Sequence, residues 1–402
     1  MPNVMARARA FRDRDFVALL IGTALLYVAC VPLMNGDVRN YLIPWTHYLL
    51  DHGRFAAFGD NFSEYAPPYL YLLALGSWTA PVIGVVPAIK LVSIVGTVVL
   101  SVAMYALLAT RLTRRQALSG AALTLIAPTA VANGPIWGQC DALYTSCAIL
   151  AVAAFIRQRP ALAMMAVGAA VSFKLQGIFI APLVLAMLLA GRARWWTLAI
   201  IPATYVVAML PAWLAGRPAI DLALLYLRQG HHYHDLARSV PNIWQILRAL
   251  VTIPYPVGVA SGLLAAGGAT IAVAWRTRRH LLQPEDVVLV ALLGAIVVPY
   301  LLPKMHNRYF FMADLLAGAY VFLRPTPRAF WIVRLVTIGS LLSYATFLLH
   351  LTGGAFVGAF AMTAGLVLTW REVRERLPDG RPVAPLAEAA HFKGSCPQFI
   401  KE

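Results

Sequence analysis

Residues 16–33 read FVALLIGTALLYVACVPL, an apolar run that decides the fold class. An α-helix rises about 1.5 Å per residue and the hydrocarbon core of a bilayer is about 30 Å thick, so roughly 20 apolar residues cross it. Four arginines precede the run: Arg7, Arg9, Arg12 and Arg14. The run is longer than the apolar region of a secretory signal and lacks a small-residue cleavage site. We therefore expect an uncleaved first membrane helix.

The composition extends this conclusion to the whole chain. Of the 402 residues 60% are hydrophobic and 12% are charged, and the mean hydropathy is +0.71. Soluble proteins are about 45–50% apolar and about 25% charged. A soluble globular protein, a disordered protein and a disulfide-stapled secreted domain are therefore excluded, and the four cysteines show no metal-binding spacing.

Basic clusters recur along the chain and predict its topology. They lie near residues 111–115, 157–159, 192–194, 276–279, 324–328 and 371–376. Lys and Arg flank the cytoplasmic ends of membrane helices, so all six clusters are placed there together with the N-terminus. This predicts an all-α polytopic membrane protein with about twelve transmembrane helices and both termini in the cytoplasm. Most of the net charge of +16 is then an orientation signal, and nucleic acid is not expected as a partner.

We expect one integral membrane domain over residues 1–376 and a cytoplasmic tail over 377–402. The two long external loops are predicted at about 34–86 and 215–256. Residues 67–86 are interpreted as an outer or re-entrant segment broken by Pro81 and Pro87, with 87–110 as the next span. Residues 38–49 have apolar side chains at helical spacing, which predicts an amphipathic helix kinked near Pro44.

Polar residues gather in the predicted external segments. Asp37 directly follows the first helix, where it would either cap the amphipathic helix or accept a proton at the water edge of a cavity. Asp141 begins an apolar run, where a carboxylate is costly and often functional. Asp314 lies inside the tenth predicted span and requires a basic or polar partner, for which Lys174 and Arg308 are the candidates.

Two further groups of polar residues leave alternatives open. Lys304, His306 and Arg308 could hold a phosphate, but a solvated loop or contact with lipid headgroups fits the same charges. The cluster His231, His232 and His234 could hold a metal only with a distant fourth ligand.

Several short motifs occur in a recognisable order. They are Asp37, Glu64-Tyr65-Ala66-Pro67-Pro68-Tyr69-Leu70, Trp137-Gly138-Gln139-Cys140-Asp141, Lys174-Leu175-Gln176, Asn242-Ile243-Trp244 and His306-Asn307-Arg308-Tyr309. In this the chain resembles the GT-C superfamily of integral membrane glycosyltransferases, and it is most similar to bacterial relatives of the second mannosyltransferase of GPI-anchor assembly. The resemblance covers roughly residues 35–310.

The resemblance implies transfer of a sugar from a polyprenyl-phosphate donor to a glycan or lipid-linked acceptor at the outer face of a bacterial inner membrane. It implies inversion at the sugar, Asp37 as general base, and no metal or other cofactor. Donor-phosphate binding would fall to Lys304, His306, Arg308 and Lys174. Substrate-orienting roles would fall to Asn40, Tyr41, Trp45, Glu64, Tyr65, Trp137, Gln139, Asp141, Gln176, Asn242 and Trp244.

Two other classes of function fit the same sequence. A multi-span transporter or lipid flippase would also have charged residues inside the membrane, although transporters usually contain internal repeats, and none is visible here. A polymer transferase resembling the O-antigen ligases would use the same kind of donor, with its essential basic residues in a large late external loop such as 215–256.

Overall fold

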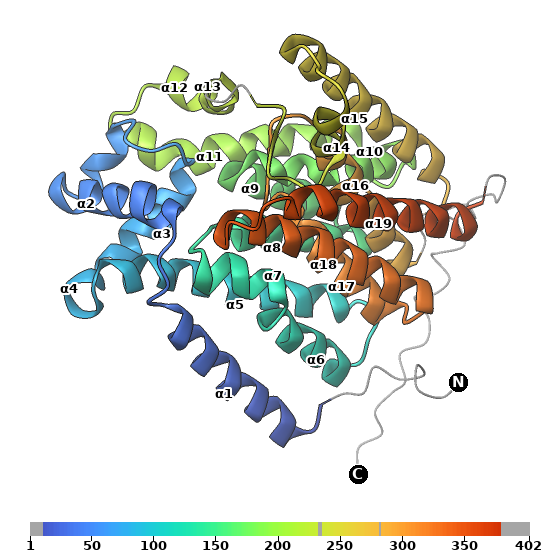
Figure 1. Ribbon diagram of the computed structural model, residues 1–402, viewed down its shortest axis with the longest axis horizontal. Helices are drawn as coiled ribbons and strands as arrows, with labels where there is room; N and C mark the ends of the chain where they lie inside the picture. Colours follow the sequence, from blue (N-terminus) through green and yellow to red (C-terminus); the bar gives the residue numbers. More distant parts are fainter. Residues whose placement is uncertain (1–10, 232–234, 281–282, 379–402) are drawn as a thin grey trace.

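The computed structural model describes residues 11–231, 235–280 and 283–378, with side chains of 230 and 231 left out (Figure 1). Within these ranges the chain is helical apart from turns and one pair of two-residue strands, β1 (Ala237–Arg238) and β2 (Met305–His306), which run parallel. The predicted all-α class is confirmed. The predicted tail is described only as far as residue 378, and His232 and His234 of the histidine cluster lie outside the described residues.

Six helices are long and apolar enough to cross a membrane. They are α5 (Val85–Leu108), η5 with α11 (Trp195–Leu214), α15 (Tyr255–Thr277), α16 (Pro284–Leu301), α18 (Pro327–Leu348) and α19 (Gly354–Arg376). A seventh span would be formed by α6 (Arg114–Leu125) continued by α7 (Pro128–Val131) and η3 (Ala132–Ile136), which are bent by 46°. The protein is therefore an integral membrane protein by its helices, whereas twelve spans remain a prediction.

The count of twelve depends on shorter helices. The described elements that would supply the remaining spans are α1 (Asp13–Cys30), α8 (Asp141–Ile156), α9 (Pro160–Phe173), η4 with α10 (Leu175–Leu189) and α17 (Phe311–Leu323). α1 overlaps the predicted first helix, and the other four lie between two successive basic clusters, where the predicted topology requires a pair of spans. Several are shorter than the roughly 20 residues that cross a bilayer, so their lengths alone do not establish a crossing.

The first loop contains the helices that the sequence predicts, with one difference. A π-helical turn, η1 (Val38–Leu42), runs into α2 (Ile43–Asp51), and Pro44 lies in the first turn of α2. After η2 (Ala56–Gly59), α3 (Pro67–Ser77) and α4 (Ala80–Ile83), the chain turns at Gly84, whose φ of 91° suits glycine. The expected break at Pro87 is wrong: a first-turn proline lacks only an N–H that has no helical partner, so α5 begins at Val85.

The core lies around α8 and α16, which are buried on nearly every side. A helix that is apolar all round fits only where other helices surround it. Small residues allow close packing between α18 and α19: a Cβ added at Gly358 would lie 2.8 Å from the carbonyl oxygen of Gly339. Such close approaches are typical of helices packed in membranes, where backbone contact replaces a hydrophobic driving force.

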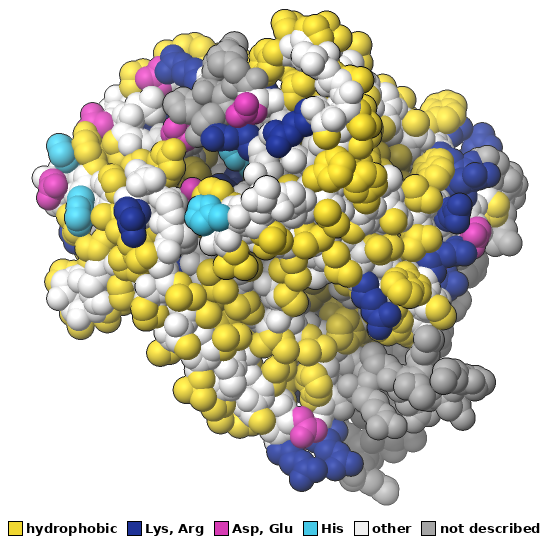
Figure 2. All heavy atoms as spheres, viewed as in Figure 1, with side chains coloured by type: hydrophobic (Ala, Val, Ile, Leu, Met, Phe, Trp, Pro, Cys, Tyr) yellow, Lys and Arg dark blue, Asp and Glu magenta, His cyan; other side chains and the backbone are white. Residues whose placement is uncertain are grey.

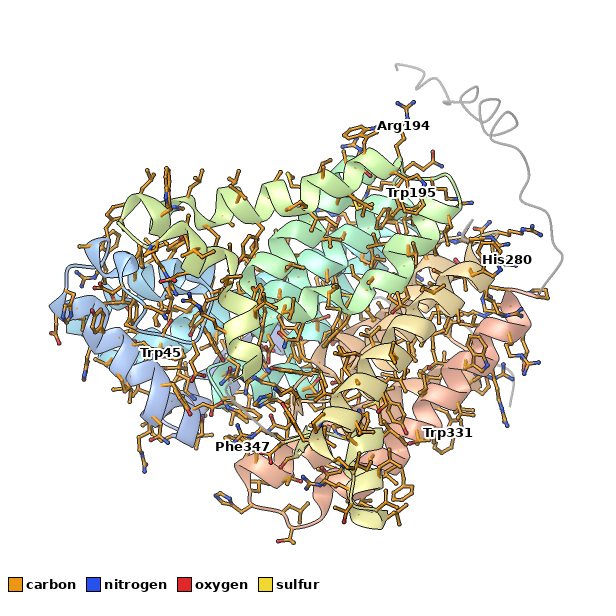
Figure 3. All side chains as sticks on the ribbon, turned by 90° about the horizontal axis from the view of Figure 1, so that it is seen from above. Trp45, Arg194, Trp195, His280, Trp331 and Phe347 are labelled. Carbon is orange, nitrogen blue, oxygen red and sulfur yellow. The ribbon has the colours of Figure 1, made fainter. Side chains whose placement is uncertain are left out.

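The bundle has two chemically different ends. We call one the arginine end, because α8, α10 and α17 lead there into Arg157, Arg192 and Arg324. Arg194 lies at this end, far from Trp45 (Figure 3). Basic side chains gather along the right and lower margins of the surface, next to a broad apolar region (Figure 2). This separation is the one that the positive-inside rule predicts, without showing which side of a membrane each end faces.

The opposite end, here the loop end, joins the two predicted external loops. The second of them contains α12 (Ala219–Ala223), α13 (Leu225–His231) and α14 (Ile243–Leu250). The buried guanidinium of Arg217 donates to the side chain of Asn61, and the Gln229 side chain donates to the Glu64 carbonyl. The β1–β2 pairing adds a contact between residues 237–238 and 305–306. Segments far apart in the sequence therefore meet at the loop end.

Candidate functional site

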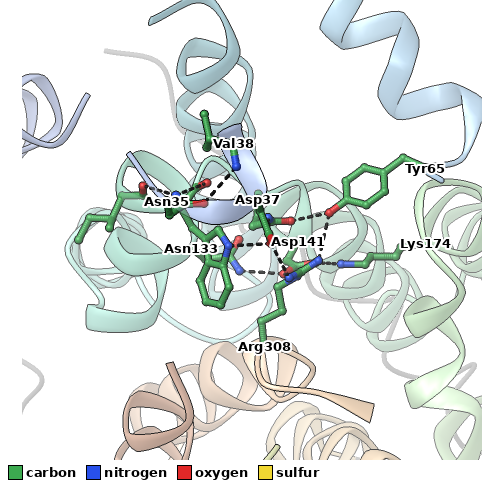
Figure 4. A network of polar contacts seen from close by, with 11 residues as sticks. Asn35, Asp37, Val38, Tyr65, Asn133, Asp141, Lys174 and Arg308 are labelled. Carbon is green, nitrogen blue, oxygen red and sulfur yellow. Dashed lines mark hydrogen bonds and ion pairs between the residues drawn. The ribbon is translucent and has the colours of Figure 1, made fainter. Parts of the chain in front are cut away.

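The centre of the loop end is the carboxylate of Asp37 (Figure 4). Its Oδ2 accepts hydrogen bonds from Trp137 Nε1 at 2.9 Å, Gln139 Nε2 at 2.9 Å and Arg308 Nη1 at 3.2 Å. Within the described part of the chain its Oδ1 accepts none. The side chain is 20% exposed. One oxygen is thus fixed by three donors while the other is left for a further partner.

Asn35 explains why Asp37 is available. The Oδ1 of Asn35 accepts the backbone N–H of Val38 at 3.1 Å, which is the capping bond that the sequence alone could equally have assigned to Asp37. The amide of Asn35 donates to the carbonyls of Ile136 and Trp137 at 3.3 and 3.1 Å. The same side chain therefore starts the helical turn and fixes the loop of Trp137 against it.

Lys90 supports this loop from inside the bundle. It is fully buried in α5, and its ammonium donates to the carbonyls of Leu33 at 3.0 Å, Pro135 at 2.8 Å and Ile136. A lysine in an apolar helix is costly unless several acceptors surround it, so three carbonyls meet that requirement. Gly138 packs beside it with a φ of 78°, which favours glycine. Asn35 and Lys90 thus position the Trp137 segment from two sides.

Asp141 forms a second carboxylate centre close to the first. It is the first residue of α8 and is fully buried. It forms an ion pair with Lys174, a second one with Arg308 Nε at 3.3 Å, and it accepts a hydrogen bond from Asn133 Nδ2 at 2.8 Å. The partners satisfy the charge that made an acidic residue at this position costly. The sequence indicated Asp141 as a candidate but did not reveal these partners.

Arg308 connects the two centres. It contacts Asp37 and Asp141 and also donates to the Tyr65 hydroxyl at 3.1 Å, while that hydroxyl donates to Gln139 Oε1 at 2.6 Å. Burial acts to lower the pKa of Arg308, but the neighbouring Tyr65, Asp141 and Asp37 outweigh it and raise the pKa well above its usual range. Burial raises the pKa of Tyr65 well above its ordinary value. Arg308 is therefore a permanent cation and Tyr65 a neutral donor.

Lys174 approaches Asp141 from the end of α9. Its backbone is extended, with φ −163° and ψ 136°, which ends the helix and turns the side chain toward the site. The ammonium lies 5.4 Å from the ring centre of Tyr309 and 5.8 Å from those of Tyr65 and Tyr144. Aromatic faces attract cations at such distances. Two acidic and two basic side chains thus form the centre of the site, with a formal sum of zero.

The three basic residues of the 304–308 segment are placed differently from one another. Arg308 is inside the network, whereas the ammonium of Lys304 lies 5.2 Å from the ring centre of Tyr255. Burial, followed by the nearby positive charge of Arg308, lowers the pKa of His306 to about 3. His306 is therefore neutral at pH 7. His306 therefore adds no charge to the segment at pH 7, and Lys304 and Arg308 have different neighbours.

The aromatic candidates divide into two kinds. Trp137 is fully buried, with Phe347 stacked on its ring at 4.8 Å and Arg308 at 5.5 Å. It can therefore position Asp37 through its N–H, but it offers no open face on which a sugar could stack. Trp45 is also largely buried, and its ring lies 5.1 Å from that of Tyr65 and 5.8 Å from that of Tyr41.

The remaining predicted site residues lie at the margin of the network or support the fold. Asn40 and Tyr41 are exposed, Glu64 is half-buried, and the amide oxygen of the buried Gln176 has no hydrogen-bond partner among the described residues.

Asn242 and Trp244 have structural contacts. Asn242 caps α14 through Gln245 N–H at 3.2 Å and donates to carbonyls at the end of α16, as does the Trp244 indole at 2.8 Å. Their placement fixes the second loop and gives them no direct contact with Asp37.

Comparison with known proteins adds no assignment. The chain matches no family model and no curated protein.

Four residues that support or border the site were absent from the predicted site residues: Asn35, Lys90, Asn133 and Arg238. Arg238 lies beside His306 in the β1–β2 pair and contributes to the lowered pKa of that histidine. Lys90 gave a usable signal, a lone lysine in a long apolar helix. Asn35 and Asn133 gave none, because an asparagine near a turn is ordinary in any protein.

Another hollow, with a volume of about 530 Å³, lies at the arginine end. It is lined by Arg159, Arg192, Arg194 and Trp196, among others. It begins where α9 begins, whereas Lys174 follows the opposite end of that 14-residue helix, about 20 Å away at 1.5 Å per residue. It includes none of the predicted site residues.

Proposed function

We propose that the protein is a membrane glycosyltransferase that moves a sugar from a polyprenyl-phosphate donor to an acceptor hydroxyl. The observation that carries the proposal is the carboxylate of Asp37, with Oδ2 held by three donors and Oδ1 open at a partly exposed position. A general base needs this combination of fixed orientation and one accessible oxygen. The resemblance of the surrounding motifs to the GT-C superfamily gives the reaction class.

The proposed step is a single displacement. Asp37 Oδ1 takes the proton of the acceptor hydroxyl as the acceptor oxygen forms a bond to the anomeric carbon. The bond from that carbon to the phosphate oxygen breaks, and its electron pair leaves with the polyprenyl phosphate. The configuration at the anomeric carbon is inverted. Trp137 and Gln139 hold the base in place, and no metal or other cofactor takes part in the proposed step.

Binding of the donor would involve Arg308 and Lys174. Their charges are balanced by Asp37 and Asp141 in the structure, so a phosphate would have to compete with a carboxylate for them. Arg308 offers a planar fork suited to phosphate, and of its two carboxylate partners Asp37 is the more exposed, at 20% against 0% for Asp141. Donor binding would then draw Arg308 from Asp37 and leave the base free for the acceptor.

The difference between the arginine end and the loop end supports a location of the site at the outer face of the membrane. With the arginine end in the cytoplasm, the loop end faces the outside of a bacterial inner membrane, with both termini inside. Nucleotide sugars are scarce there, which favours a lipid-linked donor. The acceptor would be a glycan or a lipid-linked glycan of the cell envelope.

The test is Asp37→Asn. The asparagine oxygen can accept the bonds now made to Oδ2, so the network is kept while the proton acceptor is lost. Membranes containing the variant are given labelled polyprenyl-phosphate sugars, and transfer to endogenous acceptors is measured. We expect a loss of about 10²–10⁴-fold, the usual contribution of a general base. Asp51→Asn, an exposed acid of the same loop, is the matched control and should transfer normally. Equal transfer by both variants would refute the assignment of the base.

One observation favours the transporter alternative. The helix formed by α6, α7 and η3 is bent by 46°, and discontinuous helices line the substrate sites of many transporters. A flux of solute or lipid without a covalent sugar product, unchanged in Asp37→Asn, would support that alternative. A polymer transferase would instead be recognised by its acceptor, a preformed polysaccharide chain, in the same transfer assay.

A further inference from the structure

The starting point is the carboxylate of Asp314 in α17. The side chain is 6% exposed, and neither oxygen has a hydrogen-bond partner among the described residues. Both basic residues that the sequence offered as partners are engaged elsewhere: Lys174 pairs with Asp141, and Arg308 pairs with Asp37 and Asp141. A buried carboxylate without compensation is too costly to persist, so something else must neutralise it.

Asp314 lines a cavity of about 150 Å³ between α5, α6, α7, α17 and α18. The residues lining this cavity include no lysine, arginine or histidine. Liquid water occupies about 30 Å³ per molecule, so the cavity has room for a small ion with a few waters. Water alone could fill the space but would not balance the charge.

The other polar groups near Asp314 are oxygens. The hydroxyls of Thr129, Thr337 and Ser340 face the carboxylate without reaching hydrogen-bonding geometry. Ser340 is fully buried, and its hydroxyl also lacks a partner within the described ranges. Asp314, Thr129 and Thr337 line the cavity together, so their oxygens are arranged as they would be around a shared ligand. Hard cations are bound by such carboxylate, hydroxyl and carbonyl oxygens.

The same cavity touches the break between α6 and α7. The carbonyl of Thr124 lacks the usual partner four residues later, because residue 128 is proline, and it accepts the N–H of Ala127 at 3.3 Å instead. The C-terminal end of a helix carries partial negative charge from its last carbonyls. Thr124, Ala127, Pro128 and Thr129 all line the cavity. A helix end of this polarity attracts a cation and repels an anion.

We propose that this cavity binds one monovalent cation, Na⁺, through Asp314 and the surrounding hydroxyl and carbonyl oxygens. A single carboxylate supplies one negative charge, which one monovalent ion balances. The site is separate from the network of Asp37 and does not depend on the reaction proposed for it. The ion would join α17 and α18 to the bent helix, so its binding should stabilise the folded protein.

The test uses the purified full-length protein in detergent. Its unfolding midpoint is measured in NaCl, KCl and choline chloride at constant ionic strength, and binding of ²²Na⁺ is measured directly. We expect a saturable rise of about 3 °C at a Na⁺ concentration about 100 times the dissociation constant, with one ion bound per chain. A midpoint that is the same in all three salts, with no ²²Na⁺ retained, would overturn the proposal in favour of a protonated Asp314.

Variants distinguish the site from general salt effects. Asp314→Asn should lose both Na⁺ binding and the Na⁺-dependent shift, and it should fold without Na⁺ because the buried charge is gone. Thr337→Val keeps the carboxylate and should weaken Na⁺ binding at least several-fold, which keeps the test decisive even where Asp314→Asn does not fold. Thr270→Val removes a hydroxyl bonded to its own helix in α15 and should leave binding unchanged. Undiminished binding in Asp314→Asn and Thr337→Val would refute the site.

Discussion

The ion pair between Lys174 and Asp141 allows a quantitative test of the network. Lys174→Met removes one of the two cations that compensate a fully buried carboxylate, since the Asp141 side chain is 0% exposed and that of Lys174 12%. Removing one partner of a buried pair costs about 3–5 kcal/mol, because the remaining charge is left buried. Asp141→Asn should lower the free energy of unfolding by a similar amount, because the positive charges of Lys174 and Arg308 then repel each other without a carboxylate between them. The double variant has no uncompensated charge at this position, so it should recover much of the loss.

The cost can be expressed as a thermal shift. Unfolding entropy is about 2.1 cal/mol/K per residue, which gives about 0.8 kcal/mol/K for 402 residues. A loss of about 3–5 kcal/mol then lowers the midpoint by about 4–6 °C. The unfolding midpoints are measured by size-exclusion chromatography after heating. The wild type, both single variants and the double variant together form a double-mutant cycle. We expect a coupling energy of at least about 1.5 kcal/mol.

The exposed pair of Arg228 and Asp221 provides the control. Its atoms are 2.7 Å apart, but the side chains are 50% and 23% exposed. The same cycle with Arg228→Gln and Asp221→Asn should give a coupling of about 0.2–1 kcal/mol. The reasoning is refuted if the Lys174 and Asp141 losses add to within about 0.5 kcal/mol, since independent sites behave in that way.

Three further predictions concern single residues of the loop end. The pKa of His306 is lowered from about 6.5 to about 3, so between these values the unfolded chain binds a proton that the folded chain does not. The contribution of His306 to the free energy of unfolding is therefore complete above about pH 6.5. It falls by up to about 2 kcal/mol at pH 5. His306→Gln should remove that part of the decline when midpoints at pH 7 and 5 are compared. Gly138→Ala should cost about 1–2 kcal/mol at its φ of 78°, whereas Gly268→Ala, with no atom within 4 Å, should be neutral or stabilising by about 0.5–1 kcal/mol. Lys90→Met should lower stability by about 2–3 kcal/mol through its released carbonyls, and an unchanged midpoint would contradict the role given to Lys90.

The helices could be predicted because their signal is local. A long apolar run requires a helix in a membrane whatever surrounds it, and proline in a first turn has the same effect everywhere. The expected break at Pro87 is wrong because Pro87 was expected to separate the outer segment from a span over 87–110, whereas the chain turns at Gly84 and α5 begins at Val85. The number of spans does not follow from the same local signal, because several apolar helices are short and their lengths do not decide whether they cross.

The site could be predicted residue by residue but not as an arrangement. Asp37, Asp141, Lys174 and Arg308 each stood out as a charge at an unusual position. Their pairing depends on how α8, α9 and two loops pack, and no local pattern reports that a carboxylate at 37 will meet an arginine 271 positions later. The same limit hid the structural role of Asn242, which resembles a binding residue in the sequence and acts as a helix cap.

Asp141 and Asp314 show this limit in its simplest form. Each is an acidic residue near the start of an apolar helix: Asp141 is the first residue of α8 and Asp314 the fourth of α17. For both positions we expect the same free-energy cost of burying a charge. A lysine, an arginine and an asparagine compensate Asp141, whereas the described residues that line the cavity of Asp314 include no basic side chain. The sequence therefore indicates that the charge of each carboxylate must be compensated. Only the packing of the helices shows whether another side chain compensates it. Asp314 must therefore be neutralised by a proton or by a cation from solution, and the oxygens that line its cavity are the reason for placing a cation there.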